Sequence, residues 1–153
     1  MRALAIDFGA RRVGLALSDP SGTLARPWRA LDRRGPDAAI VAEIAGLVAA
    51  LAAEDEGLTT IVIGLPSRLD GTPHEMTARV RAFAAALRAC VTFPIVFQDE
   101  RLSSREAESR LAIRERDWRR RKALIDAASA AVILQDYLDG LADARGVRTE
   151  EED

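Results

Sequence analysis

The first third of the chain alternates hydrophobic and polar positions with the period of β-strands. Residues 3–7 form a short apolar run that ends in an acid, and Arg12–Ser18 follows after a tight connection at 9–11. Residues 19–22 have the composition of a turn, and 23–31 form a third candidate strand. Strands joined by such short connections predict an antiparallel meander.

The period changes to that of helices after this meander. Pro36 suits the first turn of a helix, and apolar side chains recur one turn apart from Ile40 to Leu51. The same spacing returns from Met76 to Leu87 and predicts a second helix over about 74–90. Two strong amphipathic helices are therefore expected in the middle of the chain.

Two short segments, 59–63 and 95–98, predict the fourth and fifth strands. Capping-box spacing of Ser103 and Glu106 predicts a third helix to about 113, and a last helix covers about 122–141. The resulting order predicts an α/β fold with a mixed five-stranded sheet, a meander followed by βαβ units, and helices on both faces. We expect one domain over 1–145 and a disordered acidic tail over 146–153.

Composition narrows the choice of function. The 153 residues are 48% hydrophobic, and 22 Lys and Arg against 24 Asp and Glu give a net charge of −2. Any contact with nucleic acid must then come from a local basic patch. The single cysteine, Cys90, excludes an internal disulfide and is expected to pack at a helix end. Because no leader pattern and no apolar stretch of about 20 residues is found, we expect a cytoplasmic protein without membrane contact.

Two acids stand in apolar surroundings. Asp7 ends a strand just before the chain must turn, at the sheet edge where α/β folds place their sites, although a solvated turn aspartate is the alternative. Asp126 lies in a segment, 123–134, whose only other polar side chain is Ser129, so we expect it to be buried. An ionised buried carboxylate is costly unless a cation compensates it. Lys122, one turn earlier, or a metal ion could supply that charge.

A third acidic position follows the fifth strand, where Asp99 and Glu100 are adjacent. Neighbouring residues point in different directions, so only one can face Asp7, and a solvated ion pair with Arg101 is an equal alternative. Three acids would form an oxygen-only cluster that favours Mg²⁺ or Mn²⁺. Two such ions can activate water and stabilise the leaving oxygen of a phosphodiester. His74, the one histidine, has no partner spacing for nucleophilic catalysis.

Basic residues lie close in sequence to these acids. Arg11 and Arg12 follow Asp7, and a second cluster precedes Asp126. That second cluster consists of Arg114, Arg116, Arg119, Arg120, Arg121 and Lys122. Trp118 lies among them and is expected to anchor the loop, with stacking on an unpaired base as the alternative. Such groups suit the positioning of phosphates without recognition of bases. The alternative is a solvated charged connection, since acids interleave with the second cluster.

Taken in order, several segments resemble the YqgF/RuvX family of the ribonuclease H-like superfamily. They are Ala5-Ile6-Asp7-Phe8-Gly9 with Arg12-Val13-Gly14-Leu15-Ala16, Val62-Ile63-Gly64-Leu65-Pro66, Asp70-Gly71, Asp99-Glu100-Arg101-Leu102-Ser103-Ser104, and Lys122 with Asp126-Ala127-Ala128 to Leu134-Gln135. Each segment is a weak signal by itself. The ordered set covers nearly the whole chain and is specific.

The resemblance implies an RNase H-like fold and a metal-dependent nuclease, with Mg²⁺ or Mn²⁺ bound by Asp7, Glu100 and Asp126, which match the family's acidic triad. It implies processing of the 5′ end of pre-16S ribosomal RNA in ribosome biogenesis. The alternative is resolution of Holliday junctions in branched DNA, which would imply a homodimer. The residues expected to contact nucleic acid are Arg11, Arg12, Arg101, Arg119, Arg120, Arg121 and Lys122.

Two departures from the family pattern limit what can be carried over. The fourth strand ends in Gly64-Leu65-Pro66, where many superfamily members have an acid, so the third acid must come from the next strand. That leaves Asp99 as an alternative to Glu100. The loop 67–76 also departs from the usual version, so substrate contacts there are not carried over.

Two other functions are compatible with parts of the sequence. Asp7-Phe8-Gly9 also resembles the phosphate-binding turn of an actin-like phosphotransferase, but that architecture needs a second phosphate loop that this short chain lacks. A non-catalytic nucleic-acid-binding module is the third hypothesis. The presence of all three acids disfavours it, because a scaffold gains nothing from the cost of Asp126.

Overall fold

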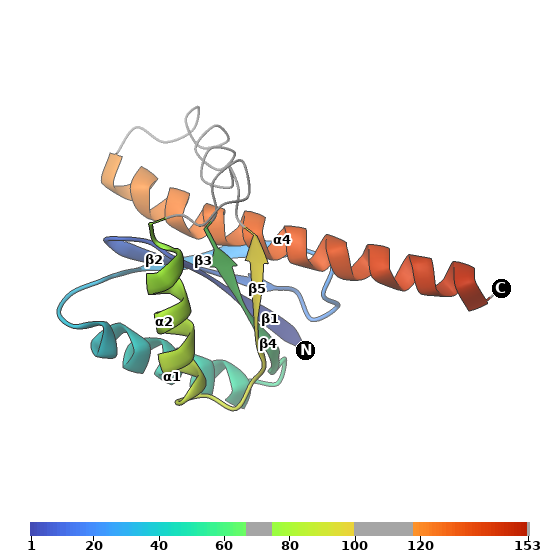
Figure 1. Ribbon diagram of the computed structural model, residues 1–153, viewed down its shortest axis with the longest axis horizontal. Helices are drawn as coiled ribbons and strands as arrows, with labels where there is room; N and C mark the ends of the chain where they lie inside the picture. Colours follow the sequence, from blue (N-terminus) through green and yellow to red (C-terminus); the bar gives the residue numbers. More distant parts are fainter. Residues whose placement is uncertain (67–74, 100–117, 153) are drawn as a thin grey trace.

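A five-stranded mixed sheet organises the protein (Figure 1). The computed structural model describes residues 1–66, 75–99 and 118–152, with side chains over 1–66, 75–99 and 123–146. The strands are β1 (Arg2–Phe8), β2 (Arg12–Ser18), β3 (Ala25–Asp32), β4 (Leu58–Leu65) and β5 (Ile95–Asp99), and the helices are α1 (Asp37–Ala53), α2 (Thr77–Arg88) and α4 (Trp118–Glu152).

The strands lie in the order β3-β2-β1-β4-β5. The first three strands pair antiparallel, β4 pairs parallel with β1, and β5 pairs parallel with β4. Helices α1 and α2 cover one face of the sheet and α4 crosses the other (Figure 1). The predicted meander, the βαβ units and the helices on both faces are therefore confirmed.

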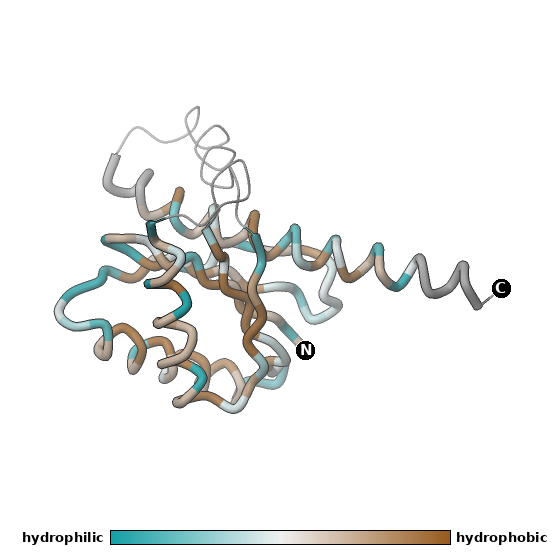
Figure 2. Tube along the Cα trace, viewed as in Figure 1, coloured by the Kyte–Doolittle hydropathy of each residue, from teal (hydrophilic) through white to brown (hydrophobic). Residues whose placement is uncertain are grey.

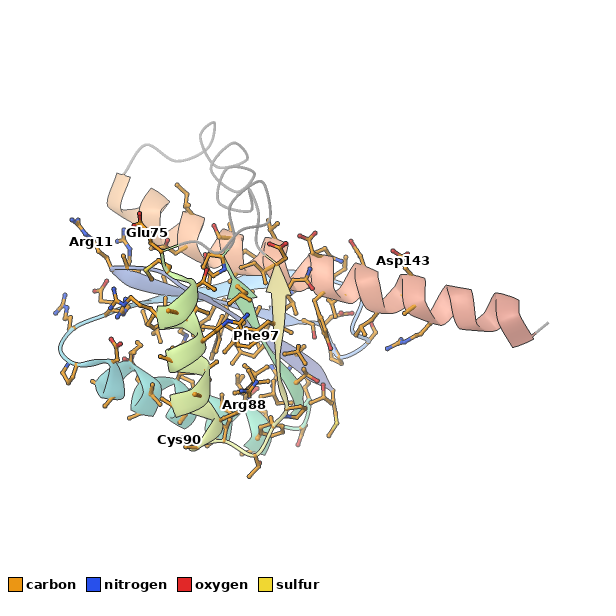
Figure 3. All side chains as sticks on the ribbon, in the orientation of Figure 1. Arg11, Glu75, Arg88, Cys90, Phe97 and Asp143 are labelled. Carbon is orange, nitrogen blue, oxygen red and sulfur yellow. The ribbon has the colours of Figure 1, made fainter. Side chains whose placement is uncertain are left out.

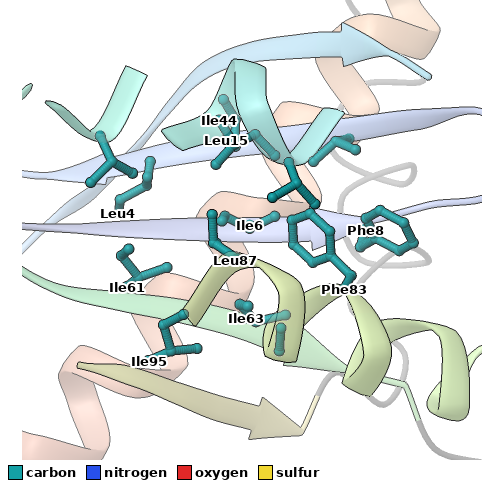
Figure 4. Close-up of a cluster of buried hydrophobic side chains, with 14 of the residues drawn as sticks. Leu4, Ile6, Phe8, Leu15, Ile44, Ile61, Ile63, Phe83, Leu87 and Ile95 are labelled. Carbon is teal, nitrogen blue, oxygen red and sulfur yellow. The ribbon is translucent and has the colours of Figure 1, made fainter. Parts of the chain in front are cut away.

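The two faces of the sheet carry side chains of different size. On β1, Leu4, Ile6 and Phe8 point to the α1–α2 face, whereas Ala3 and Ala5 point to the α4 face. Figure 4 shows the large residues of the first face packed under α2, and the central strands stand out as strongly hydrophobic in Figure 2. Large side chains separate α1 and α2 from the sheet, and small ones let α4 approach it closely.

Helix α4 approaches the sheet very closely at Gly14 of β2. A Cβ atom built on Gly14 would lie 1.9 Å from the backbone oxygen of Asp126, so the helix backbone rests directly on the strand. Further along α4, the Gln135 side chain accepts a hydrogen bond from the Ala25 amide (2.9 Å) and donates one to the Thr23 carbonyl (3.0 Å). Helix α4 is thus fixed against the meander at two separate points.

The side chain of Arg33 stabilises the turn between β1 and β2. Its guanidinium donates to the carbonyls of Gly9 (2.9 Å) and Ala10 (3.1 Å) and pairs with Asp37 at 2.6 Å. It also lies over the Phe8 ring, 4.2 Å from the centroid. The turn that follows Asp7 is therefore rigidly supported.

Several predictions of element length and burial need correction. The last helix, predicted over about 122–141, is α4 (Trp118–Glu152). It extends into the segment 146–153 because Gly140 and Gly146 are not enough to end a helix among such helix formers as Leu141, Ala142 and Ala144. Cys90 was predicted to pack at a helix end, and this is wrong, since it is exposed in the turn after α2.

The helix predicted from Ser103 to about 113 lies outside the described residues. No helix in the part of the chain that the structure describes is long and apolar enough to cross a membrane.

The Gly14 contact generates a stability prediction. Gly14→Ala would force the α4 backbone away from β2, and we expect the free energy of unfolding to fall by about 1–3 kcal/mol, as for other overpacked sites. The matched control is Gly46→Ala in α1, where an added Cβ meets nothing within 4 Å. That change should raise stability by about 0.5–1 kcal/mol. Urea unfolding of both variants measures the difference, and equal effects would contradict the contact.

The turn between β2 and β3 generates a pH prediction. Asp19 accepts hydrogen bonds from the Ser21 hydroxyl and from the Leu24 and Thr23 amides, which together lower its pKa from 3.8 to about 2. Since the folded pKa is depressed, the stabilisation of this turn is complete above about pH 4 and is lost as the pH falls towards 2. NMR titration should give the low pKa in wild type and a higher one in Ser21→Ala. A wild-type pKa at the ordinary value would refute the prediction.

Candidate active site

The carboxyl ends of three parallel strands meet at one edge of the sheet. β1, β4 and β5 run in the same direction and end at Phe8, Leu65 and Asp99. Asp7 lies near the end of β1, the central strand of the sheet, and is half-buried. It shares the α4 face with Ala3 and Ala5 by strand alternation. Asp7 therefore lies where the parallel strands end, as the sequence predicts.

Helix α4 brings Asp126 to the same place. Asp7 pairs with Gly14 across the β1–β2 ladder, and Gly14 is the residue against which the Asp126 backbone rests. The two carboxylates therefore come from positions that flank one glycine on one face of the sheet. The sequence predicts a buried Asp126, but its side chain is 32% exposed, while its Oδ2 atom, on the Arg12 side, is buried.

Arg12 supplies a compensating cation for Asp126. Its Nε atom lies 2.8 Å from Oδ2 of Asp126, and the Arg12 side chain is 24% exposed. Lys122, the partner considered from sequence, has a side chain outside the described set. The charge of Asp126 is thus compensated by an arginine of β2, on the face of the sheet that α4 covers.

The third predicted acid is only partly located. Asp99 ends β5, is exposed, and pairs in register with Leu65. By alternation it falls on the same face as Phe97, whose ring lies under the guanidinium of Arg81 of α2 at 5.5 Å. Asp99 and Asp7 are therefore on opposite faces of the sheet. Glu100 and Arg101 lie outside the described residues.

The two described acids, Asp7 and Asp126, have the kind of ligand atoms that a hard cation binds. Asp7 and Asp126 offer carboxylate oxygens, which Mg²⁺ and Mn²⁺ prefer. A guanidinium already lies against Asp126, so this position stabilises positive charge. Among residues 1–66, 75–99 and 118–152 no group of three or more His, Cys, Asp or Glu forms a metal cluster. Two acids of the predicted three are thus brought together by described elements.

The basic residues divide into those the structure places and those it does not. Arg11 is exposed at the β1–β2 turn, at the same end of the molecule as Glu75 before α2 (Figure 3). Arg119, Arg120, Arg121 and Lys122 fall in the first turns of α4, with side chains outside the description. Arg88 and Cys90 lie at the opposite end of α2 (Figure 3). The candidate site therefore has exposed arginine on the β1–β2 side.

Sequence reasoning missed two residues that shape this site. Gly14 admits the α4 backbone, and a glycine inside a strand pattern is the signal that could have indicated a close approach. Arg33 holds the turn that presents Arg11 and Arg12, and no local pattern marks it. Both act through backbone contacts between distant segments.

Known proteins resemble this chain over most of its length. Residues 1–140 match the family described as "RuvX: Holliday junction resolvase". A "Putative pre-16S rRNA nuclease" of Maridesulfovibrio salexigens is 42% identical over 138 residues, covering 90% of this chain and 98% of that protein. One of the same name from Anaeromyxobacter dehalogenans strain 2CP-C is 42% identical over 141 residues, covering 91% and 97%.

A solved structure, the RuvC of T. thermophilus in complex with a Holliday junction substrate, has a TM-score of 0.53 and 15% sequence identity to this chain. The likeness covers 93% of this chain and 96% of that one. It shows the fold alone, which is the RNase H-like fold that the resemblance implied. With the match over residues 1–140 and the relatives at 42% identity, the chain belongs to the RuvX family.

Proposed function

We propose that this protein is a divalent-metal-dependent endonuclease that hydrolyses phosphodiester bonds in structured nucleic acid in the cytoplasm. Its substrate is the 5′ end of pre-16S ribosomal RNA, as the names of its relatives suggest. The observation that carries the proposal is the convergence of Asp7 and Asp126 on Gly14. Two acids from opposite ends of the chain on one face of the sheet, with Arg12 beside Asp126, offer the oxygen ligands that a divalent cation prefers.

The proposed ligands of Mg²⁺ or Mn²⁺ are Asp7, Glu100 and Asp126. Asp99 is the less suitable of the two adjacent acids, because its strand position is on the face opposite Asp7. When bound, the ions supply activated water and charge stabilisation at the leaving oxygen. Asp7 contributes a carboxylate near the end of the central strand of the sheet, where pairing with Gly14 of β2 holds its backbone.

A set of basic side chains is proposed to bind the substrate. Arg11 and Arg12 follow the turn after β1, and Arg33 fixes that turn through the carbonyls of Gly9 and Ala10. Together with Arg101, Arg119, Arg120, Arg121 and Lys122, they are proposed to contact phosphates. Contacts of this kind position the backbone without recognising bases, so binding should weaken steeply with salt.

Branched DNA is the second candidate substrate, because the family description names Holliday junction resolvases. Symmetric cleavage of a four-way junction would require two active sites and hence a homodimer. The two substrates are separated by measuring cleavage rates of a pre-16S leader RNA, a four-way DNA junction and single-stranded DNA with and without Mn²⁺. Metal-independent binding with no cleavage of any substrate would instead indicate a non-catalytic module.

The proposed ligands generate a prediction for activity. Asp7→Asn and Asp126→Asn keep the shape of each side chain but remove a charged ligand, and each should lower the Mn²⁺-dependent cleavage rate by more than about 100-fold, the upper loss seen for outer-shell partners. Glu100→Gln should do the same. RNA binding and folding by circular dichroism should change little.

The matched control is Asp99→Asn, which alters an exposed carboxylate at the end of the neighbouring strand. We expect it to cleave at a rate close to wild type. If Asp99→Asn is inactive while Glu100→Gln is active, the choice between these two ligands is reversed. If Asp7→Asn cleaves as fast as wild type, the proposed site is wrong.

A further inference from the structure

The ion pair between Arg12 and Asp126 lies inside the proposed metal site. The Arg12 Nε atom is 2.8 Å from Asp126 Oδ2, and the two side chains are 24% and 32% exposed. The pair joins β2 to α4, and the rest of α4 is fixed by Gly14 and Gln135. Helix α4 therefore has contacts with the sheet other than this ion pair.

A guanidinium at this distance does for the carboxylate what a metal ion would do. It neutralises a half-buried negative charge, whose isolation would be costly. A guanidinium also keeps its charge throughout the physiological pH range. A divalent cation that binds Asp126 must therefore enter a site where a positive charge already lies, and like charges within a few ångströms repel.

Arg12 has a second acidic neighbour away from the site. It pairs in register with Asp32 of β3, so the two side chains share a face of the sheet as cross-strand neighbours. The Asp32 side chain is 57% exposed and contacts Arg34 at 3.4 Å. Arg12 thus lies between an acid inside the proposed site and an acid at the exposed rim.

We infer that Arg12 is a displaceable counter-ion of Asp126, which stabilises the metal-free protein and competes with the divalent cation for that carboxylate. This inference rests on the proposed function, because it takes Asp126 as a metal ligand. Binding of the cation moves the guanidinium away from Asp126, towards the rim and Asp32. The metal affinity of the protein is then set partly by an arginine that is not a ligand.

The test is calorimetric titration of Mn²⁺ alone into the metal-free full chain. Arg12→Met keeps the length of the side chain without the charge, and we expect its Kd for Mn²⁺ to be about tenfold lower than that of wild type, a difference of about 1.4 kcal/mol. The matched control is Arg11→Met, which removes the exposed neighbouring charge. It should change the Kd by less than about twofold, since exposed charges are screened.

Thermal unfolding gives a second readout that does not depend on activity. The metal-free Arg12→Met protein should melt below wild type, and saturating Mn²⁺ should raise its Tm by more than it raises that of wild type. A purely structural ion pair would lower both Tm values without tightening metal binding. If the Kd of Arg12→Met for Mn²⁺ is equal to or higher than that of wild type, the inference is overturned.

Two further variants keep the outcomes separate. If Arg12→Met does not fold, Arg12→Gln removes the charge but keeps a polar side chain, and its Kd for Mn²⁺ should still be lower than that of wild type. An equal or higher value overturns the inference. If Asp126→Asn leaves Mn²⁺ binding unchanged, the proposed function fails as well. If Asp126→Asn abolishes binding but Arg12→Met does not tighten it, only the counter-ion role fails.

Discussion

The close contact between α4 and Gly14 is the constraint on which the rest of the site depends. Small residues on one face of β1 and β2 allow the helix backbone to touch the sheet, while large residues on the other face build the main core. Because Gly14 pairs with Asp7, this contact decides which helix residue meets the central strand. A helix held farther away would leave Asp7 and Asp126 as unrelated surface acids.

The contact also creates an electrostatic requirement. A carboxylate on the inner side of α4 needs a positive partner, and Arg12 of β2 supplies one across the interface. The arginine is presented by a turn that Arg33 fixes through two backbone carbonyls. Fold and charge are thus coupled, since the strand that admits the helix also carries the cation that its acid requires. The proposed nuclease chemistry would replace that internal cation by a metal.

Much of the architecture follows from local sequence patterns. Strand alternation and helical spacing predict the sheet, its meander and the two-sided helix arrangement. Asp7 and Asp126 stand out in the sequence because one acid ends an apolar run and the other interrupts one. The pairing of Asp126 with Arg12 was not predicted, because it depends on the crossing point of α4 over β2. That crossing is set by the missing side chain of Gly14, and local periodicity does not show which distant backbone will fill the space.

The central claim is that the α4 contact assembles one cation site from Asp7 and Asp126. Anomalous diffraction from crystals of the full chain grown with Mn²⁺ measures this most directly. We expect an anomalous peak within bonding distance of both carboxylates, with the Arg12 guanidinium displaced from Asp126. A peak elsewhere, or Mn²⁺ bound to neither acid while the Arg12–Asp126 pair stays intact, would contradict it.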